Sequence, residues 1–203
     1  MKITLEQLHE IYPHARGAHI KTFLPFLNKY LPIYGMDNCK RVAAYLGQMG
    51  HECAQFNFLE EQQSKYNTAP GGEPYALYDG RKATLGNYVI GDGKAYRGRG
   101  LVMLTGRFNY GKYGNKLSLP LLTKPELAGD PECAVRISLE YWKENNLNSH
   151  ADAWNLTRIT EIINGKAKLG LKERQDISNR ALKVLTPKEI SDAKEDKDYI
   201  RAG

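Results

Sequence analysis

The sequence predicts a mostly α-helical fold with a long ordered loop held between its helices. Three observations indicate this class. Apolar residues recur at spacings of three and four in several segments, strand signals are sparse, and the stretch from Ser64 to Gly100 combines eight glycines with five tyrosines. A loop of this length inside a compact domain is usually functional or disordered, and its aromatic residues argue against disorder.

The N-terminal part of the chain is predicted to form two short helices and one strong helix. The short helices cover residues 4–12 and 19–31, and the strong helix runs from Asp37 to Phe56. In the strong helix the apolar side chains share one stripe, and Asp37 or Asn38 can cap the first turn. Three prolines are expected to punctuate this region: Pro13, Pro25 and Pro32.

Helical patterns return after Thr105. Asp130-Pro131-Glu132 predicts a helix start, because an acidic cap is followed by proline at the first helical position, and this helix is expected to end near Asn145. Two more helices are predicted over residues 156–163, stopped by Asn164-Gly165, and over residues 171–185. The segment Thr186-Pro187-Lys188-Glu189 has the pattern of a capping box and predicts a short, charged final helix.

We expect one folded domain over residues 1–185 and a charged tail over residues 186–203. The tail holds four Lys or Arg and five Asp or Glu, so it contributes −1 to the formal net charge of +6 and the body carries +7. Such a charge favours polyanions, which include nucleic acid, an anionic membrane surface and an anionic cell-wall polymer. Solubility alone is the alternative explanation of this charge.

Several classes of protein are disfavoured by the composition. The N-terminus MKITLEQLHE lacks the apolar region of a secretion signal, so we expect synthesis in a cytoplasm. No apolar run approaches the roughly 18–20 residues that cross a bilayer. Cys39, Cys53 and Cys133 are odd in number and have no CxxC spacing, which disfavours a disulfide framework or a zinc site. Cys53 falls on the apolar stripe and is expected to be a buried thiol.

The segment GHECAQFNFLEE, from Gly50 to Glu61, contains candidates for acid and base chemistry. Glu52 lies beside Tyr45 at the edge of the apolar stripe, and one-sided loss of water favours the protonated carboxyl that a general acid needs. This geometry alone favours a boundary glutamate in a salt bridge. Glu61 follows nine residues later, beside Glu60. A second carboxylate roughly 6.5–9.5 Å from the acid would leave room for water and give inversion at a sugar carbon.

Two further features of the sequence leave alternatives open. The loop GDGKAYRGRG lacks the spacing of a phosphate-binding loop. Its glycines Gly98 and Gly100, on either side of Arg99, indicate that the backbone closely approaches a ligand or a neighbouring segment, or that it forms a tight turn. Arg174 lies on an apolar helical stripe, so we expect a partner, and it could orient Glu52 or Glu61. A surface arginine with a buried stem fits this pattern about as well.

Five blocks of the sequence together resemble glycoside hydrolase family 19, and most of all its single-domain bacteriophage endolysins. They are, in chain order, AYLGQMGHECAQF, EEQQSKYNT, YDGRKATLGNYVIGDGKAYRGRGLVMLTGRFNYGKYG, IINGK and LKERQDI. The resemblance runs from about Leu8 to Leu185 and is most specific from Tyr78 to Tyr113 and at Gly50-His51-Glu52. It implies a lysozyme-like, two-lobed catalytic domain with a cleft, over residues 1–185, that needs no metal or cofactor.

The resemblance also implies a role for individual residues. Glu52 matches the family's general acid, Glu61 its general base, and Thr105 the hydroxyl residue that helps to hold the attacking water. Arg174 matches an arginine that pairs with the site carboxylates. The residues matched to the substrate-binding cleft are His51, Tyr96, Arg97, Asn109, Asn164 and Arg174.

Two positions depart from the family pattern. Met103 stands where the family usually has Gln, and Lys166, at the end of IINGK, stands where it commonly has Gly. Both put a chitin-type subsite pattern in doubt, and a cationic lysine suits an anionic substrate. We therefore expect a phage-type endolysin, a muramidase that cleaves the β-1,4 bond between N-acetylmuramic acid and N-acetylglucosamine with inversion. It would be made in the host cytoplasm and would reach the periplasmic wall through a pore formed by another protein.

Two alternatives to the muramidase stay open. A chitinase of the same fold is one, although plant enzymes of that kind are usually secreted and rich in disulfides. A non-catalytic protein that binds the cell wall or nucleic acid is the other, and the joint presence of Glu52, Glu61 and Thr105 argues against it. We expect a monomer that binds peptidoglycan, with no nucleic-acid partner and no stable membrane insertion.

Overall fold

The computed structural model describes residues 1–187 of the chain, so nearly all of the predicted final helix lies outside the described residues. In residues 1–187 no β-strand forms, which confirms the mostly α-helical class. The helices are α1 (Leu5–Ile11), α2 (Gly17–Tyr30), α3 (Cys39–Glu52), α4 (Lys82–Leu85), α5 (Asp92–Ala95), α6 (Arg107–Leu117), α7 (Pro131–Glu144), α8 (Leu147–Asp152), α9 (Leu156–Asn164) and α10 (Leu171–Leu185). Short 3-10 helices cover Pro32–Tyr34, Ala76–Tyr78 and Pro125–Gly129.

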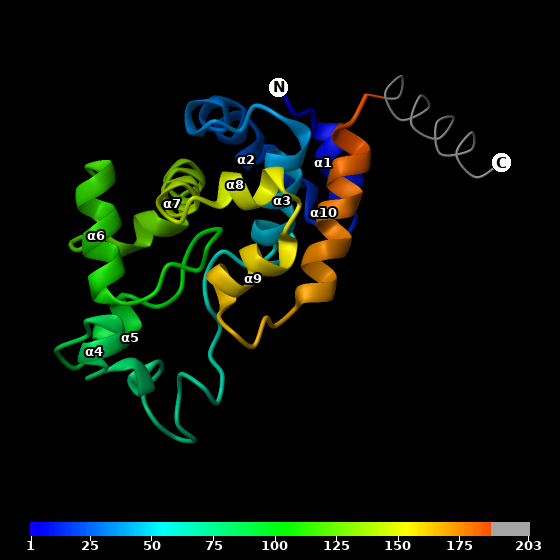
Figure 1. Ribbon diagram of the computed structural model, residues 1–203. Helices are drawn as coiled ribbons and strands as arrows, with labels where there is room; N and C mark the ends of the chain where they lie inside the picture. The colour runs from blue at the N-terminus through cyan, green and yellow to red at the C-terminus, as the bar shows by residue number, and fades with distance from the viewer. Residues whose placement is uncertain (188–203) are drawn as a thin grey trace.

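The larger of two lobes is built around α3 and α10, which lie side by side in Figure 1. Apolar side chains from α1, α2, α3, α7, α8, α9 and α10 form its core. Two glycines let the neighbours of α3 approach its backbone closely. A Cβ on Gly47 would lie 1.8 Å from Oγ of Ser178, and a Cβ on Gly50 would lie 2.5 Å from the ring of Tyr12. This close approach brings the end of α3 next to the start of α10.

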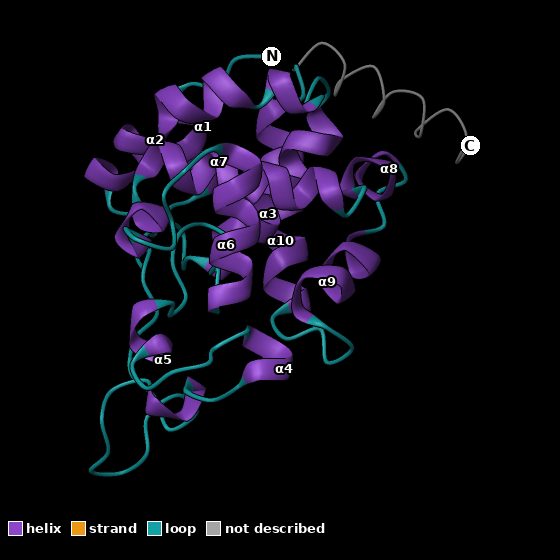
Figure 2. Ribbon diagram, turned by 90° about the vertical axis from the view of Figure 1, so that its left-hand side faces the viewer, coloured by secondary structure: helices purple, strands orange, loops and turns teal. Residues whose placement is uncertain are grey.

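The smaller lobe has its own core, which is rich in tyrosine. Buried side chains of α6, α7 and the segments around them form it: Tyr96, Leu104, Tyr110, Tyr113, Leu117, Leu121, Ala128, Cys133 and Ile137. Val102 and Tyr141 pack against both cores and lie where the lobes meet. Figure 2 shows α4, α5 and their connecting loops at the end of the molecule remote from α1 and α2. The fold therefore has two lobes, with α7 contributing to both.

Most helices form where the sequence predicts them. Asp130 caps α7 by accepting hydrogen bonds from the backbone N–H groups of Glu132 and Cys133, at 3.1 and 3.3 Å. Asn38 caps α3 in the same way through the N–H of Arg41. The predicted ranges of α9 and α10 also agree with the structure.

The strong helix predicted to reach Phe56 ends at Glu52 instead. Residues 54–56 have φ of +46°, +56° and +65°, so the backbone leaves the helical conformation there. Phe56 is nevertheless buried, with its ring edge-on to those of Tyr12 and Phe23 at centroid distances of 5.2 and 5.0 Å. The apolar spacing that predicts a longer helix arises because a turn returns Phe56 to the same core.

Pro25 and the helix α8 also differ from the sequence predictions. Pro25 does not interrupt the chain but lies inside α2, on its exposed face, where water can satisfy the carbonyl that the proline leaves without a donor. The helix α8, six residues long, was not predicted, since its sequence LNSHAD has no apolar periodicity.

Two carboxylates, those of Asp92 and Asp79, help to order the long loop. Asp92 is 2% exposed, pairs with Arg107 at 2.7 Å and accepts the N–H groups of Tyr88 and Val89. Burial raises the pKa of Asp92, but these hydrogen bonds outweigh it and hold the pKa below its ordinary value. Asp79 similarly accepts two backbone N–H groups of the same turn. The segment from 64 to 100 is thus an ordered part of the smaller lobe.

Candidate active site

Glu52 is the last residue of α3, and α10 supplies its partner. Nη2 of Arg174 lies 2.5 Å from Oε1 of Glu52, and Nη1 of the same guanidinium donates to Oε1 of Gln48 at 2.9 Å. The side chain of Arg174 is 1% exposed and that of Glu52 is 17% exposed. Gln48 in turn donates to Thr160 of α9 at 3.1 Å. Among the alternatives from the sequence, Arg174 is therefore a buried partner of Glu52, and not a surface arginine or a partner of Glu61.

His51 forms a second contact between the same two helices. Its Nδ1 lies 2.7 Å from Oε2 of Glu173, the residue before Arg174. Its ring covers Gly170, where an added Cβ would lie only 2.1–2.8 Å from ring atoms. The sequence predicts that His51 binds substrate. In the structure His51 and Glu173 join α3 to α10 and so fix Arg174 against Glu52.

Glu61 lies in the segment between the lobes and accepts three hydrogen bonds. Oε1 receives the hydroxyl of Tyr78 at 2.6 Å and the amide of Asn67 at 2.9 Å, and Oε2 receives the N–H of Gly98 at 3.0 Å. Burial raises the pKa of the Tyr78 hydroxyl, and its hydrogen bond to Glu61 raises it further, so Tyr78 remains a donor at neutral pH. These contacts set the orientation of the Glu61 carboxylate.

The neighbouring residue Glu60 joins the backbone around Glu61 to the smaller lobe. Its carboxylate pairs with Arg97 and lies 3.5 Å from Nε of Arg99. The backbone N–H of Glu61 donates to the carbonyl of Gly98, so residues 60–61 and 98–99 run as a short antiparallel pair. Arg97, predicted to line the cleft, is thus largely engaged with protein. Burial and the nearby Arg99 charge lower the pKa of Arg97.

Thr105 lies across Gly98 from Glu61. A Cβ on Gly98 would lie 3.2 Å from Oε2 of Glu61 and 3.2 Å from Oγ1 of Thr105, so both side chains border the same small space. The hydroxyl of Thr105 donates to the carbonyl of Met103 at 2.8 Å, which leaves its lone pairs able to accept a hydrogen bond. The structure therefore brings together Glu61 and Thr105, as the sequence predicts.

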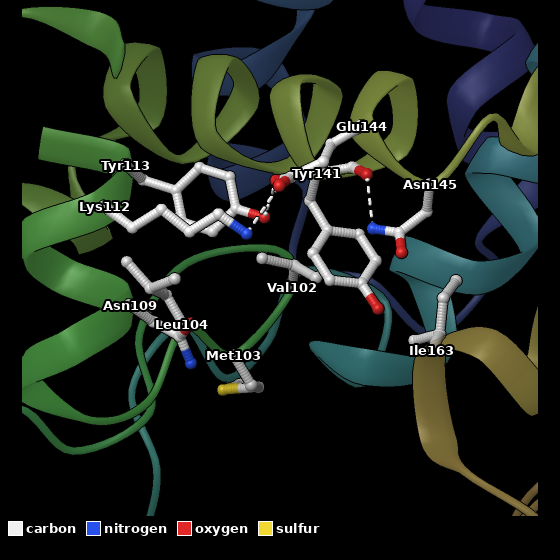
Figure 3. Close-up of a pocket in the computed structure, with 10 residues that line it drawn as sticks. All are labelled: Val102, Met103, Leu104, Asn109, Lys112, Tyr113, Tyr141, Glu144, Asn145 and Ile163. Carbon is white, nitrogen blue, oxygen red and sulfur yellow. Dashed lines mark hydrogen bonds and ion pairs between the residues drawn. The ribbon is translucent and has the colours of Figure 1, made fainter. Parts of the chain in front are cut away.

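A pocket of about 280 Å³ lies where the two lobes meet (Figure 3). Its lining comes from α6, α7, the end of α9 and the segment before Thr105: Val102, Met103, Leu104, Asn109, Lys112, Tyr113, Tyr141, Glu144, Asn145 and Ile163. Burial raises the pKa of Tyr141, and the charges of Glu52 and Glu144 raise it further. Tyr141 is thus a lining residue of the pocket on which the charge of Glu52 acts.

The two predicted sugar-binding amides lie at different places around this pocket. Asn109 lines it and donates to the carbonyl of Thr105 at 2.9 Å. Asn164 ends α9, next to the lining residue Ile163, and its Oδ1 accepts the N–H of Leu169 at 2.7 Å. Asn164 thus holds the loop between α9 and α10 and keeps its amide NH₂ for another partner.

The structure places Tyr96, which the sequence predicts to bind substrate, in the core of the smaller lobe. The side chain is 4% exposed, packs in the smaller core against Tyr110 and donates its hydroxyl to the carbonyl of Leu122 at 3.0 Å. Its place in a recognisable sequence block could not separate a cleft aromatic from a core aromatic. Periodicity gives no help in a loop, where burial depends on contacts distant in sequence.

Sequence reasoning missed several residues that hold the site. Gln48 and Glu173 fix Arg174 and His51, and Asn67 and Tyr78 orient Glu61. The one available signal was the number of tyrosines in the long loop, which indicated order but not which hydroxyl would reach a carboxylate.

Residues 1–187 contain neither a cluster of metal ligands nor a helix that could span a membrane. No three His, Cys, Asp or Glu side chains are grouped as metal ligands. None of the described helices combines the length and apolarity needed to cross a bilayer.

Several known proteins are similar to this chain, although no family model matches it. A glycosyl hydrolase family 19 domain-containing protein of Haemophilus influenzae is 28% identical over 196 residues, which cover 86% of this chain and 92% of that protein. An endochitinase of Arabidopsis thaliana is 31% identical over 133 residues, or 64% of this chain and 42% of that enzyme. The chain therefore spans less than half of this plant relative.

Solved structures share the fold. A bacterial family 19 chitinase has a TM-score of 0.68 at 21% identity and covers 90% of this chain, with 94% of its own chain matched. Chitinase C from Streptomyces griseus has a TM-score of 0.65 at 19% identity, with 90% and 92% covered. The resemblance seen in the sequence is thereby confirmed: the chain is similar to chitinase-like glycoside hydrolases of family 19, and it is a glycoside hydrolase.

Proposed function

We propose that the protein is an endolysin-type muramidase that hydrolyses β-1,4 bonds of bacterial peptidoglycan by an inverting acid/base mechanism. The observation that carries this proposal is the arrangement of two carboxylates. Glu52 is fixed by helices of the larger lobe, and Glu61 is fixed by donors from the long loop that belongs to the smaller lobe. Inverting glycosidases use such a pair, one as acid and one as base.

Glu52 acts as the general acid in this proposal. Arg174 occupies Oε1, so Oε2 is the oxygen that carries the proton and delivers it to the glycosidic oxygen as the bond breaks. Arg174 stabilises the carboxylate that Glu52 becomes when it has given up its proton. The contacts of His51 with Glu173 and of Gln48 with Arg174 hold this geometry.

Glu61 acts as the general base. Its three donors leave lone pairs on both oxygens, and the space shared with Thr105 beside Gly98 is where a water would be held. The water loses its proton to Glu61 as it attacks the sugar carbon from the face opposite the leaving group. The pocket between the lobes supplies an aromatic face from Tyr141 and an amide from Asn109 for a sugar ring.

Charge favours peptidoglycan among the β-1,4-linked amino-sugar polymers. The formal net charge is +6, and peptidoglycan carries carboxylates on its peptides whereas chitin is neutral. The enzyme is made in the bacterial cytoplasm and reaches the wall through a pore formed by another protein. Chitin is the second candidate substrate, because several similar proteins are endochitinases.

Digestion of purified Gram-negative peptidoglycan and of chitin oligosaccharides tests the proposal. Wild type is compared with Glu52→Gln and with a matched control, Glu10→Gln, at an exposed position of α1. We expect fragments that end in reducing N-acetylmuramic acid, released by wild type and control and not by Glu52→Gln. Cleavage of chitin oligosaccharides without release from peptidoglycan would assign the enzyme to chitin instead.

A further inference from the structure

The loop between α9 and α10, residues 165–170 with the sequence GKAKLG, borders the site on the side of the acid. At its start, Ile163 of α9 lines the pocket in Figure 3. At its end, Gly170 lies against the ring of His51, and the carbonyl of Leu169 accepts a hydrogen bond from Nε of Arg174 at 3.2 Å. The loop therefore connects the pocket to the residues that hold Glu52.

Hydrogen bonds hold this loop in an ordered turn. Asn164 accepts the N–H of Leu169 at 2.7 Å, and the N–H of Lys168 donates to the carbonyl of Gly165 at 3.0 Å. Nζ of Lys168 also reaches the carbonyl of Lys166 at 2.9 Å. The turn fixes the backbone from which both lysines project, and Lys166 is exposed to solvent.

The charge of these lysines is only partly offset by the protein around them: the pKa of the nearby Glu161 is lowered mainly by its hydrogen bond to Arg158 and in smaller part by the charges of Lys168 and Lys166. The nearby carboxylates already have partners: Glu161 pairs with Arg158, Glu173 with His51 and Asp176 with Lys172. Among the residues that the structure describes, neither Lys166 nor Lys168 forms an ion pair. The loop thus presents a net positive charge, without an ion pair of its own, beside the residue Ile163 that lines the pocket.

We propose that this loop is a subsite for the carboxylates of the peptide stem on N-acetylmuramic acid, with Lys166 and Lys168 as the residues that recognise them. This inference rests on the peptidoglycan substrate proposed above and deepens it. The stem projects from the sugar and ends in mobile carboxylates, and lysine is suited to them, being a flexible point charge that needs no fixed bidentate geometry. Neutral chitin offers no group for this loop to bind.

The test is a charge series at the exposed Lys166. Wild type, Lys166→Gln and Lys166→Glu are assayed for kcat/KM on native peptidoglycan and on the same peptidoglycan after its carboxylates have been converted to neutral amides. We expect about a 3-fold fall for Gln and a further fall for Glu on the native substrate, as exposed charge pairs of modest strength predict. We expect no change across the series on the amidated substrate, and a smaller effect at high salt.

A control and two contrary outcomes complete the test. Lys21→Gln, on an exposed face of α2, removes one positive charge elsewhere and should leave kcat/KM on both substrates unchanged. An equal fall on native and amidated peptidoglycan, or no fall on either, would overturn the role of the loop while leaving the muramidase activity in place. No release from native peptidoglycan by wild type would overturn the proposed substrate and this inference with it.

Discussion

Replacing Arg174 by methionine should cost both stability and activity, because the guanidinium joins three groups in a nearly closed environment. The arginine is 1% exposed and contacts Glu52, Gln48 and the carbonyl of Leu169. Breaking a buried ion pair by removing one partner costs about 3–5 kcal/mol. Since Glu52 keeps 17% exposure, water recovers part of this, and we expect a loss of about 3 kcal/mol in the free energy of unfolding. That loss corresponds to roughly 6–12 °C in Tm for a chain of this size.

Urea unfolding and hydrolysis of peptidoglycan measure the two effects of Arg174→Met. The double variant Arg174→Met/Glu52→Gln separates the lost ion pair from lost packing, because it leaves no unpaired carboxylate. We expect the double variant to regain about half of the lost stability while remaining inactive. A single variant destabilised by less than about 1 kcal/mol, or a double variant whose losses simply add, would refute a pairing between Arg174 and Glu52 in solution.

Three further predictions concern other parts of the molecule. Tyr78→Phe removes one donor to Glu61 and should lower kcat about 10-fold with little change in KM, measured by steady-state kinetics. Burial raises the pKa of the Cys53 thiol to about 12. A thiol reagent at pH 8 should therefore label the half-exposed Cys39 in the folded protein and reach Cys53 only in denaturant. Rapid labelling of Cys53 in the folded protein would contradict this expectation. The pKa of Asp92 is lower in the folded than in the unfolded chain, so its contribution to stability is present above about pH 4 and is lost as pH falls through the folded pKa. Asp92→Asn should therefore destabilise the protein at pH 7 and weaken the fall of stability with decreasing pH, as measured by thermal unfolding from pH 7 to pH 3.

The helices were predictable because their signals are local. An acidic cap followed by proline starts α7, and Asn164-Gly165 ends α9, and both signals depend on residues a few positions apart. The end of α3 was not predictable in this way. Phe56 keeps the helical spacing of apolar residues, and only its burial beneath Tyr12 shows that the chain has turned.

The site was predictable in part for the same reason. Residue type and position on a stripe showed that Arg174 needs a partner, but only the packing of α10 on α3 selects Glu52 over Glu61. The donors around Glu61 come from up to 37 residues away along the chain, and no periodicity links them. Tyr96 shows the opposite case, since a loop tyrosine with a plausible sequence position turned out to be part of a core.

The stereochemistry of hydrolysis tests the central claim, that Glu52 and Glu61 act as acid and base in a single displacement. Time-resolved proton NMR can follow the anomeric signals of the new reducing end on a soluble oligosaccharide that the enzyme cleaves. Direct attack by water on a β-linked sugar predicts that the α-anomer forms first and that the β-anomer follows only by mutarotation. Initial formation of the β-anomer would show retention through a covalent intermediate, and it would contradict the role of Glu61 as the base that activates water.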